Sequence, residues 1–247
     1  MATSGCSVKF VPSDHGRFTA EDVAAAINDP NAQWLARTRL VNIENTCNRG
    51  GGAVWSLKEV DKIRTVCSLH GLAMHMDGAR IFNALSVTKE KPEEWGKRFD
   101  TISICLSKGL GAPVGSILVG NKVLMANARR VRKRLGGGMR QAGILAAAGH
   151  YALDHHVDRL VEDHVRATTL GDAIADLPYV DHVMPVETNI IIFTLAGGRE
   201  ASSMLTELKG SGIIAAAFGP NMVRMVLHLD IDDTDVDRTI AVLKKLQ

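Results

Sequence analysis

Three charged side chains, Asp77, Arg80 and Lys108, stand at the ends of two short apolar runs. The first run, 72–76, ends at Asp77 with Arg80 three residues later, and the second run, 101–106, ends two residues before Lys108. Apolar runs of this length are typical of inner strands in a parallel or mixed sheet. Ligands bind outside the carboxyl ends of such strands. We therefore expect an acid, a guanidinium group and an amine to meet at one rim of one sheet.

Lys108 meets the chemical requirements of a nucleophile that attacks carbonyl groups. A lysine at a strand end is usually a solvated surface group, but this one opens a glycine-rich loop, 109–115, where backbone can approach a ligand closely. A partly desolvated lysine has a lowered pKa and forms imines (Schiff bases) with carbonyl compounds. The glycines follow the lysine rather than precede it, which argues against a Walker-type phosphate loop.

Asp77 and Arg80 allow two interpretations. Taken alone, their i, i+3 spacing favours an ion pair at the start of a helix. Taken together with Lys108, they match the needs of pyridoxal phosphate, which requires a lysine for its aldehyde, an anion beside its pyridine nitrogen and a cation near its ring oxygen. The acid keeps the ring nitrogen protonated, so that the ring accepts electrons from a carbanion.

Several longer motifs resemble the threonine aldolase branch (low-specificity L-threonine aldolases) of the fold-type-I pyridoxal-phosphate enzymes. They are HMDGARIFNA at 75–84, SICLSKGLGAPVGS at 103–116, RTRLVNIENT at 37–46, GGGMRQAGILAAAGHYAL at 136–153 and MVRMVLHLDI at 222–231. The resemblance covers essentially the whole chain. It implies pyridoxal 5'-phosphate as cofactor and the cleavage of L-threonine or L-allo-threonine to glycine and acetaldehyde, an aldehyde-lyase reaction.

The resemblance also implies roles for individual residues. Lys108 resembles the Schiff-base lysine, Asp77 the partner of the pyridinium nitrogen, and Arg80 a ligand of the cofactor oxygen. The positions expected to bind substrate are Arg224, which resembles the arginine that holds the substrate carboxylate, together with Lys133 and Arg140. Because the family forms homotetramers built from tight dimers, we expect a homo-oligomer in which Lys133 and Arg140 act across a subunit interface.

Two departures from the family pattern leave alternatives open. Full-length members begin well before this chain, with a loop that binds the cofactor phosphate and a histidine that stacks on the pyridine ring. The segment 1–11 resembles a stretch beyond both, so we expect the large domain to lack its N-terminal part. Trp34 stands where some relatives carry a histidine linked to the substrate side chain. A truncated, inactive or cofactor-poor relative is therefore one alternative, and another amino-acid lyase or aminotransferase of the same fold is a second.

The elements that must position these residues alternate between strand and helix. Strands at 39–43, 72–76 and 101–106 with helices at 57–69 and 81–85 predict βαβ units and a mainly parallel sheet, which a return strand at 116–119 makes mixed. A short extended segment is expected at 7–11, a polar linker around Pro92, and further helices at 20–27, 122–135, 141–153 and 158–177. Thr19 and Ser56 are the expected N-caps, Ser56 in a capping box with Glu59.

The last third of the chain has a different character. Strand-like runs at 179–185, 189–195 and 215–230 and helices at 201–209 and 234–246 predict a small α+β unit with an antiparallel sheet. We therefore expect a partial large cofactor-binding domain at 1–158, with an aspartate-aminotransferase-like α/β fold, and a small C-terminal domain at 159–247.

Composition limits the other classes of function. The chain has 247 residues, is 46% hydrophobic and carries a net charge of +2, which favours a packed core and gives no argument for nucleic acid or membrane. No apolar run reaches the roughly 18 residues of a membrane span. The basic run 129–134 lacks aromatic neighbours for base stacking, so an anion site or a solvated helix face is preferred to nucleic-acid binding.

Cysteine and histidine patterns point to neither a metal site nor a secreted protein. The four cysteines contain no CxxC pair, and no signal peptide is visible, so a soluble cytoplasmic protein is expected. Cys105 is expected to be a buried thiol. His75 is expected to be a core histidine or a neighbour of the site. The other histidines considered, His155, His156 and His228, lack a metal-ligand pattern and are assigned to a helix surface or a strand.

Overall fold

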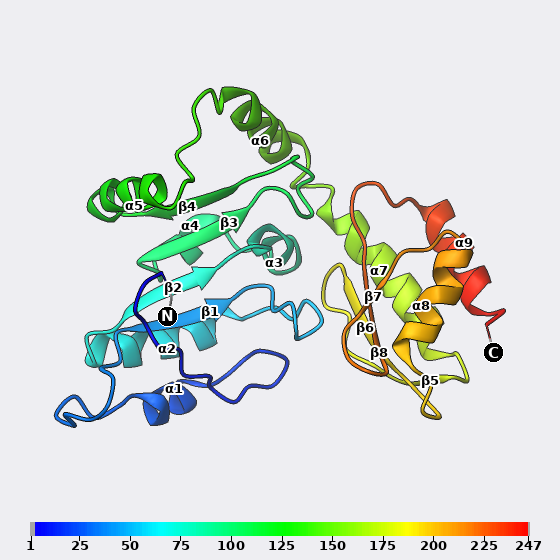
Figure 1. Ribbon diagram of the computed structural model, residues 1–247, viewed down its shortest axis with the longest axis horizontal. Helices are drawn as coiled ribbons and strands as arrows, with labels where there is room; N and C mark the ends of the chain where they lie inside the picture. Colours follow the sequence, from blue (N-terminus) through cyan, green and yellow to red (C-terminus); the bar gives the residue numbers. More distant parts are fainter. Residues whose placement is uncertain (1–2, 247) are drawn as a thin grey trace.

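The computed structural model describes residues 3–246 and contains two four-stranded sheets, each with its own helices (Figure 1). The first sheet runs in the order β1 (Leu40–Glu44), β2 (Ala73–Asp77), β3 (Thr101–Cys105) and β4 (Ser116–Gly120). The strands β1, β2 and β3 are parallel, and β4 is antiparallel to β3. The predicted mixed, mainly parallel sheet is therefore confirmed.

The helices that accompany this sheet follow the predicted order. They are α1 (Ala20–Ala26), α2 (Leu57–Leu69), α3 (Ile81–Thr88), α4 (Pro92–Gly96), α5 (Lys122–Arg134) and α6 (Gly143–His155). The helix α2 packs its apolar stripe of Val60, Ile63 and Cys67 against β2, whose Met74 and Met76 are fully buried. Burial of each such side chain contributes about 2 kcal/mol, so the strand that ends at the candidate site is held firmly from one side.

Caps fix where two of these helices begin. Thr19 forms the full capping box with Asp22 at the start of α1. Ser56 accepts a hydrogen bond from the backbone N–H of Glu59 at 3.3 Å, as predicted for α2. The expected return bond from the Glu59 carboxylate is not formed, because that carboxylate pairs with Lys62 at 2.6 Å. The capping box predicted there is thus only half present.

One local prediction for this part of the chain is wrong. The expected linker contains α4, which begins at Pro92 with two glutamates in its first turn and is anchored by the buried Trp95. Proline at the first helical position and early acidic residues both favour a helix start. The segment 7–11, expected to be extended, belongs to no strand or helix, and its apolar side chains Val8 and Phe10 are exposed.

The second sheet is antiparallel throughout, as predicted. It runs in the order β5 (Val180–Val183), β6 (Ile190–Leu195), β8 (Met222–Val226) and β7 (Ala216–Ala217), and its helices are α7 (Leu160–Ala175), α8 (Ala201–Gly210) and α9 (Asp233–Leu243). The expected run 215–230 splits into two strands because the chain turns at Gly219 and Pro220. This sheet encloses a separate apolar core with Ile191 and Phe193 at its centre.

Two sets of contacts join the halves of the molecule. The helix α7 contacts α3 of the first part and β5, β6 and α9 of the second. The loop after β1 meets the start of β6: Thr188 donates a hydrogen bond to the Gly52 carbonyl at 2.9 Å, and Glu187 accepts one from the Val54 N–H at 2.8 Å. Glu187 also pairs with Arg17 at 2.8 Å. The division at residue 158 itself stays a prediction.

Candidate active site

The carboxyl ends of β1, β2 and β3 form the rim on which the candidate site stands. Asp77 ends β2 and is in register with Glu44 on one side and Ser103 on the other, while Lys108 follows three residues after the end of β3. The Asp77 carboxylate accepts a hydrogen bond from the Ala79 N–H at 3.1 Å, which restrains it at the strand end. The structure therefore brings Asp77 and Lys108 to one rim, while their roles stay predictions.

Arg80 stands at the N-terminus of α3 without an ion-pair partner in the described part of the chain. The alternative of an Asp77–Arg80 ion pair is therefore not what the structure shows. Burial lowers the pKa of Arg80, and the guanidinium of Arg224 nearby lowers it further. Two close guanidinium groups without a paired carboxylate make an attractive place for an anion.

Arg224 comes from the other half of the molecule, on β8. Burial lowers its pKa, and its buried Nε atom has no hydrogen-bond partner among the described residues. The guanidinium lies 5.9 Å from the centre of the Phe218 ring, and that of Arg49 lies 5.4 Å from the same ring. A buried donor without an acceptor is costly, so a carboxylate bound here would satisfy it.

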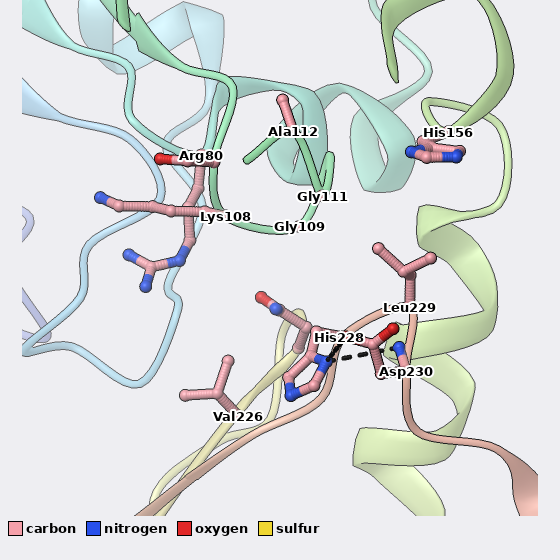
Figure 2. Close-up of a pocket in the computed structure, with 12 residues that line it drawn as sticks. Arg80, Lys108, Gly109, Gly111, Ala112, His156, Val226, His228, Leu229 and Asp230 are labelled. Carbon is pink, nitrogen blue, oxygen red and sulfur yellow. Dashed lines mark hydrogen bonds and ion pairs between the residues drawn. The ribbon is translucent and has the colours of Figure 1, made fainter. Parts of the chain in front are cut away.

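A cavity of about 530 Å³ lies between the two halves (Figure 2). The Lys108 loop and Arg80 line one side of it, the chain from Val226 to Asp230 lines another, and Asn189 also lines it. In Figure 2 the Lys108 side chain extends to the side of its loop that faces away from His156. Gly111 lies in this loop with φ +70°, and a side chain there would overlap Leu229, so the close packing of the loop depends on glycine.

Two histidines line the cavity, contrary to their expected places on a helix surface and in a strand. His156 follows the end of α6, and its Nδ1 lies 2.7 Å from the Leu110 carbonyl oxygen, which can only accept. Its Nδ1 therefore carries the proton. His228 lies just beyond β8, with Nδ1 3.6 Å from the Asp230 carboxylate. A position directly after a strand or helix end was the available signal, but their convergence depends on the packing of the two halves.

Glu44 is a site residue that the sequence analysis did not single out. It is half-buried at the end of β1, and burial raises its pKa, with the Asp77 carboxylate adding to the effect. A hydrogen bond from the Asn48 backbone and the charges of Arg80 and Lys108 oppose that rise. The available signal was an apolar run that ends in an acid, the same pattern that identified Asp77.

Lys133 and Arg140 do not join the site within one chain. Lys133 lies in the last turn of α5, where helix carbonyl groups favour cations, and it donates a hydrogen bond to the Gly138 carbonyl at 3.3 Å. Both side chains are exposed, and neither lines the cavity. The helix α5 contacts β4, the edge strand of the sheet. Their expected role therefore stays a prediction that depends on a second subunit.

Three other residues named from the sequence lie outside the cavity. His75 is half-buried, with Nδ1 2.8 Å from the Thr101 hydroxyl, as fits a core histidine. Trp34 is 84% exposed in a loop and faces no part of the site. Cys105 is half-buried rather than buried, because β4 beside it is exposed along its whole length. Within residues 3–246, no group of three or more histidine, cysteine or acidic side chains is arranged to hold a metal ion.

Comparison with known proteins identifies the relatives of the chain. The model of the beta-eliminating lyase family matches residues 1–197. "Low-specificity L-threonine aldolase 1" of Arabidopsis thaliana is 36% identical over 92% of this chain and 65% of its own length. "Low specificity L-threonine aldolase" of Escherichia coli (strain K12) is 40% identical over 87% of this chain and 62% of its own length. The chain thus spans less than two thirds of these curated relatives.

Solved structures confirm the predicted aspartate-aminotransferase-like fold. The threonine aldolase of Leishmania major has a TM-score of 0.79 at 21% identity, over 98% of this chain and 70% of that one. The ornithine delta-aminotransferase of Plasmodium falciparum has a TM-score of 0.66 at 14% identity, over 95% of this chain and 60% of that one. At these identities the likeness concerns the fold alone, and the choice of reaction depends on the site and the closer relatives.

Proposed function

The chain belongs to the beta-eliminating lyase family, and from that membership we propose that it carries out pyridoxal-phosphate-dependent cleavage of a β-hydroxy-α-amino acid. The proposed substrates are L-threonine and L-allo-threonine, and the products are glycine and acetaldehyde. Relatives at 36% and 40% identity that are named low-specificity L-threonine aldolases support this choice. Because the chain spans 65% and 62% of their lengths, the activity is proposed for the chain and is not carried over from them.

The observation that carries the proposal is the meeting of an amine, carboxylates and the guanidinium group of Arg80 at the rim, with the guanidinium group of Arg224 nearby on β8. These groups fit the ring portion of pyridoxal phosphate and the carboxylate of an amino acid, because the described residues supply Arg80 and Arg224 with no anion of their own. When bound, the cofactor supplies a ring that accepts the electrons of a carbanion.

Each residue then has a definite task. Lys108 would hold the cofactor through its aldehyde carbon, and Asp77 would keep the proton on the ring nitrogen. Arg80 would bind the ring oxygen. Arg224, on β8 in the other half of the molecule, would bind the substrate carboxylate and so fix the bond to Cα in position. Correct orientation of the breaking bond is a large part of the rate that such a site provides.

Cofactor uptake tests the proposal directly. The purified chain with added pyridoxal phosphate should show the yellow absorbance of cofactor attached to a lysine, and Lys108→Ala should lose it. The matched control is Lys58→Ala, an exposed lysine on α2 that should keep the colour. A wild-type chain that stays colourless would show that the cofactor-poor alternative is correct.

Product analysis separates the reaction classes. With threonine alone, the chain should release acetaldehyde and glycine in equal amounts. Lys108→Ala should reduce this release by at least about 1,000-fold, because the covalent step is lost. Amino transfer to an added oxo acid without acetaldehyde would instead identify an aminotransferase.

We further propose a homo-oligomer, with a tetramer built from dimers as the specific form. Its support is the set of exposed apolar side chains on β4, α5 and α6, namely Ile117, Leu118, Val119, Val123, Ile144 and Tyr151. Light scattering of the purified chain measures the mass of the oligomer.

A cytoplasmic location is proposed as well, with its support in four unpaired cysteines. In the described chain, no helix is long and apolar enough to cross a membrane.

A further inference from the structure

Glu44 lies at the carboxyl end of β1, directly beside Asp77. The two Cα atoms are register partners in parallel strands, so their side chains point to the same face of the sheet. The Asn45 N–H donates a hydrogen bond to the Asp77 carbonyl oxygen at 2.9 Å, which holds the two strand ends together. The Glu44 side chain therefore belongs to the same rim as the groups proposed to bind the cofactor.

The surroundings of the Glu44 carboxyl group suit it to exchange a proton. Three charged side chains act electrostatically on this carboxyl group: Asp77 at the end of β2, Arg80 at the start of α3 and Lys108 in the glycine-rich loop. None of these forms an ion pair with it, and within the described residues the carboxyl has only the backbone bond from Asn48. A carboxyl group that is half-buried and not locked into an ion pair can bind and release a proton.

The histidines near the site are less suited to this task. His75 is engaged by the Thr101 hydroxyl. His156 lies on the other side of the loop from the Lys108 amine (Figure 2). His228 is half-exposed and lies beside the Asp230 carboxylate, also in the far wall of the cavity. The electrostatic neighbours of the Glu44 carboxyl group, in contrast, include the Lys108 amine.

We propose that Glu44 is the catalytic base that removes the β-hydroxyl proton of the substrate. This inference rests on the proposed function of the same site. The hydroxyl O–H bond breaks, and its proton passes to the Glu44 carboxylate. The oxygen electron pair then forms the carbonyl bond of the aldehyde as the Cα–Cβ bond breaks. The electrons of that bond remain at Cα, where a bound cofactor would accept them, and Cα takes up one proton to give glycine. One proton leaves oxygen and one is added to carbon, so the reaction is balanced.

The electrostatics of the rim support this assignment. Burial and Asp77 raise the pKa of Glu44, which brings the carboxyl closer to neutral pH, where a general base works best. Glutamine has the same shape but cannot take up a proton. Glu44→Gln should therefore reduce acetaldehyde release from threonine by about 100-fold or more. Glu44→Asp should recover part of that loss, which separates loss of the carboxylate from loss of fold.

A second reaction provides the internal control. Exchange of the Cα proton of glycine for deuterium needs the cofactor but no hydroxyl proton transfer, so Glu44→Gln should leave it within about threefold of the wild type. Glu93→Gln, an exposed glutamate on α4, should leave both reactions unchanged. Equal loss of exchange and cleavage, or unchanged cleavage, in Glu44→Gln would overturn the inference while the proposed function stands.

A third measurement does not depend on cofactor. In the cofactor-free chain with carbon-13-labelled glutamate, the Glu44 carboxyl signal is the one that Glu44→Gln removes. It should titrate at higher pH than the exposed glutamates, and Lys108→Met should move it higher still, because a nearby positive charge is lost. If the pH at which the Glu44 signal titrates is the same in Lys108→Met as in the wild type, the inference is overturned, even in a chain that binds no cofactor. Absence of cofactor uptake by the wild type would overturn the proposed function and, with it, the catalytic role of Glu44.

Discussion

His164 should make the stability of the fold fall as the pH is lowered. The residue lies on α7, 9% exposed, and its Nε2 lies 3.1 Å from Nδ2 of the buried Asn83 on α3. Because that amide nitrogen is a donor, His164 must accept through Nε2 and is bound in its neutral form. Protonation would turn the acceptor into a second donor and break the link between the two helices.

The size of the effect follows from the pKa of His164. Burial lowers it from the ordinary 6.5 to about 4; the Asp163 carboxylate opposes the change and Lys89 adds to it. The unfolded chain therefore binds a proton more readily than the folded chain between these two values. The stabilisation is fully present above pH 6.5 and is lost as the pH falls toward 4. At about 1.4 kcal/mol per pKa unit, the loss is roughly 3 kcal/mol.

Urea denaturation at pH 7, 5.5 and 4.5 measures the free energy of unfolding across this window. His164→Gln removes the titrating group, so its stability should fall much less than that of the wild type over the same range. The matched control is His182→Gln, an exposed histidine on β5, which should follow the wild type. Parallel pH curves for wild type and His164→Gln would refute the reasoning, whatever the stability of the variant at pH 7.

Two further substitutions test how the halves are held together. Gly111→Ala forces a side chain into Leu229 at a positive φ, so the free energy of unfolding should fall by about 2 kcal/mol or more, as measured in urea. Glu187→Ala removes the ion pair to Arg17 and the acceptor for the Val54 N–H, which should cost roughly 1–3 kcal/mol in the same assay. Gly210→Ala, in an open helical position, and Glu93→Ala, at an exposed position of α4, are the controls. If Gly111→Ala changes the free energy of unfolding no more than Gly210→Ala does, or Glu187→Ala no more than Glu93→Ala does, the proposed role of that residue is contradicted.

The strand pattern that carries Asp77 and Lys108 could be predicted because it is local. An apolar run of about five residues followed by a polar group is what a buried parallel strand and its loop require. The direction of the return strand β4 was also predictable, because the chain between β3 and β4 is too short for a helical crossover. Such features depend on neighbours in sequence and need no knowledge of the other half.

The far wall of the cavity could not be predicted in the same way. His156 and His228 are 72 positions apart, and only the way the two halves of the molecule meet brings both to the same cavity. Glu44 was missed for another reason. Its strand was predicted, but the significance of the acid depends on its register with Asp77, which is set by the pairing of β1 with β2. The short helix α4 lies in the stretch predicted as a polar linker around Pro92, because five residues are too few to show a periodic apolar pattern.

The bonds between the loop after β1 and the start of β6 have a consequence for how the molecule folds. Thr188 and Gly52 are 136 residues apart, and Glu187 and Arg17 are 170 apart. Contacts between residues so far apart in sequence form late, because closing a long stretch of chain costs conformational entropy before the contact can stabilise the fold. Each sheet can form from nearer pairings, but the meeting of Arg224 with Arg80 has to wait for this closure. Competence to bind ligand should therefore be the last property that a refolding chain regains, after its secondary structure is complete.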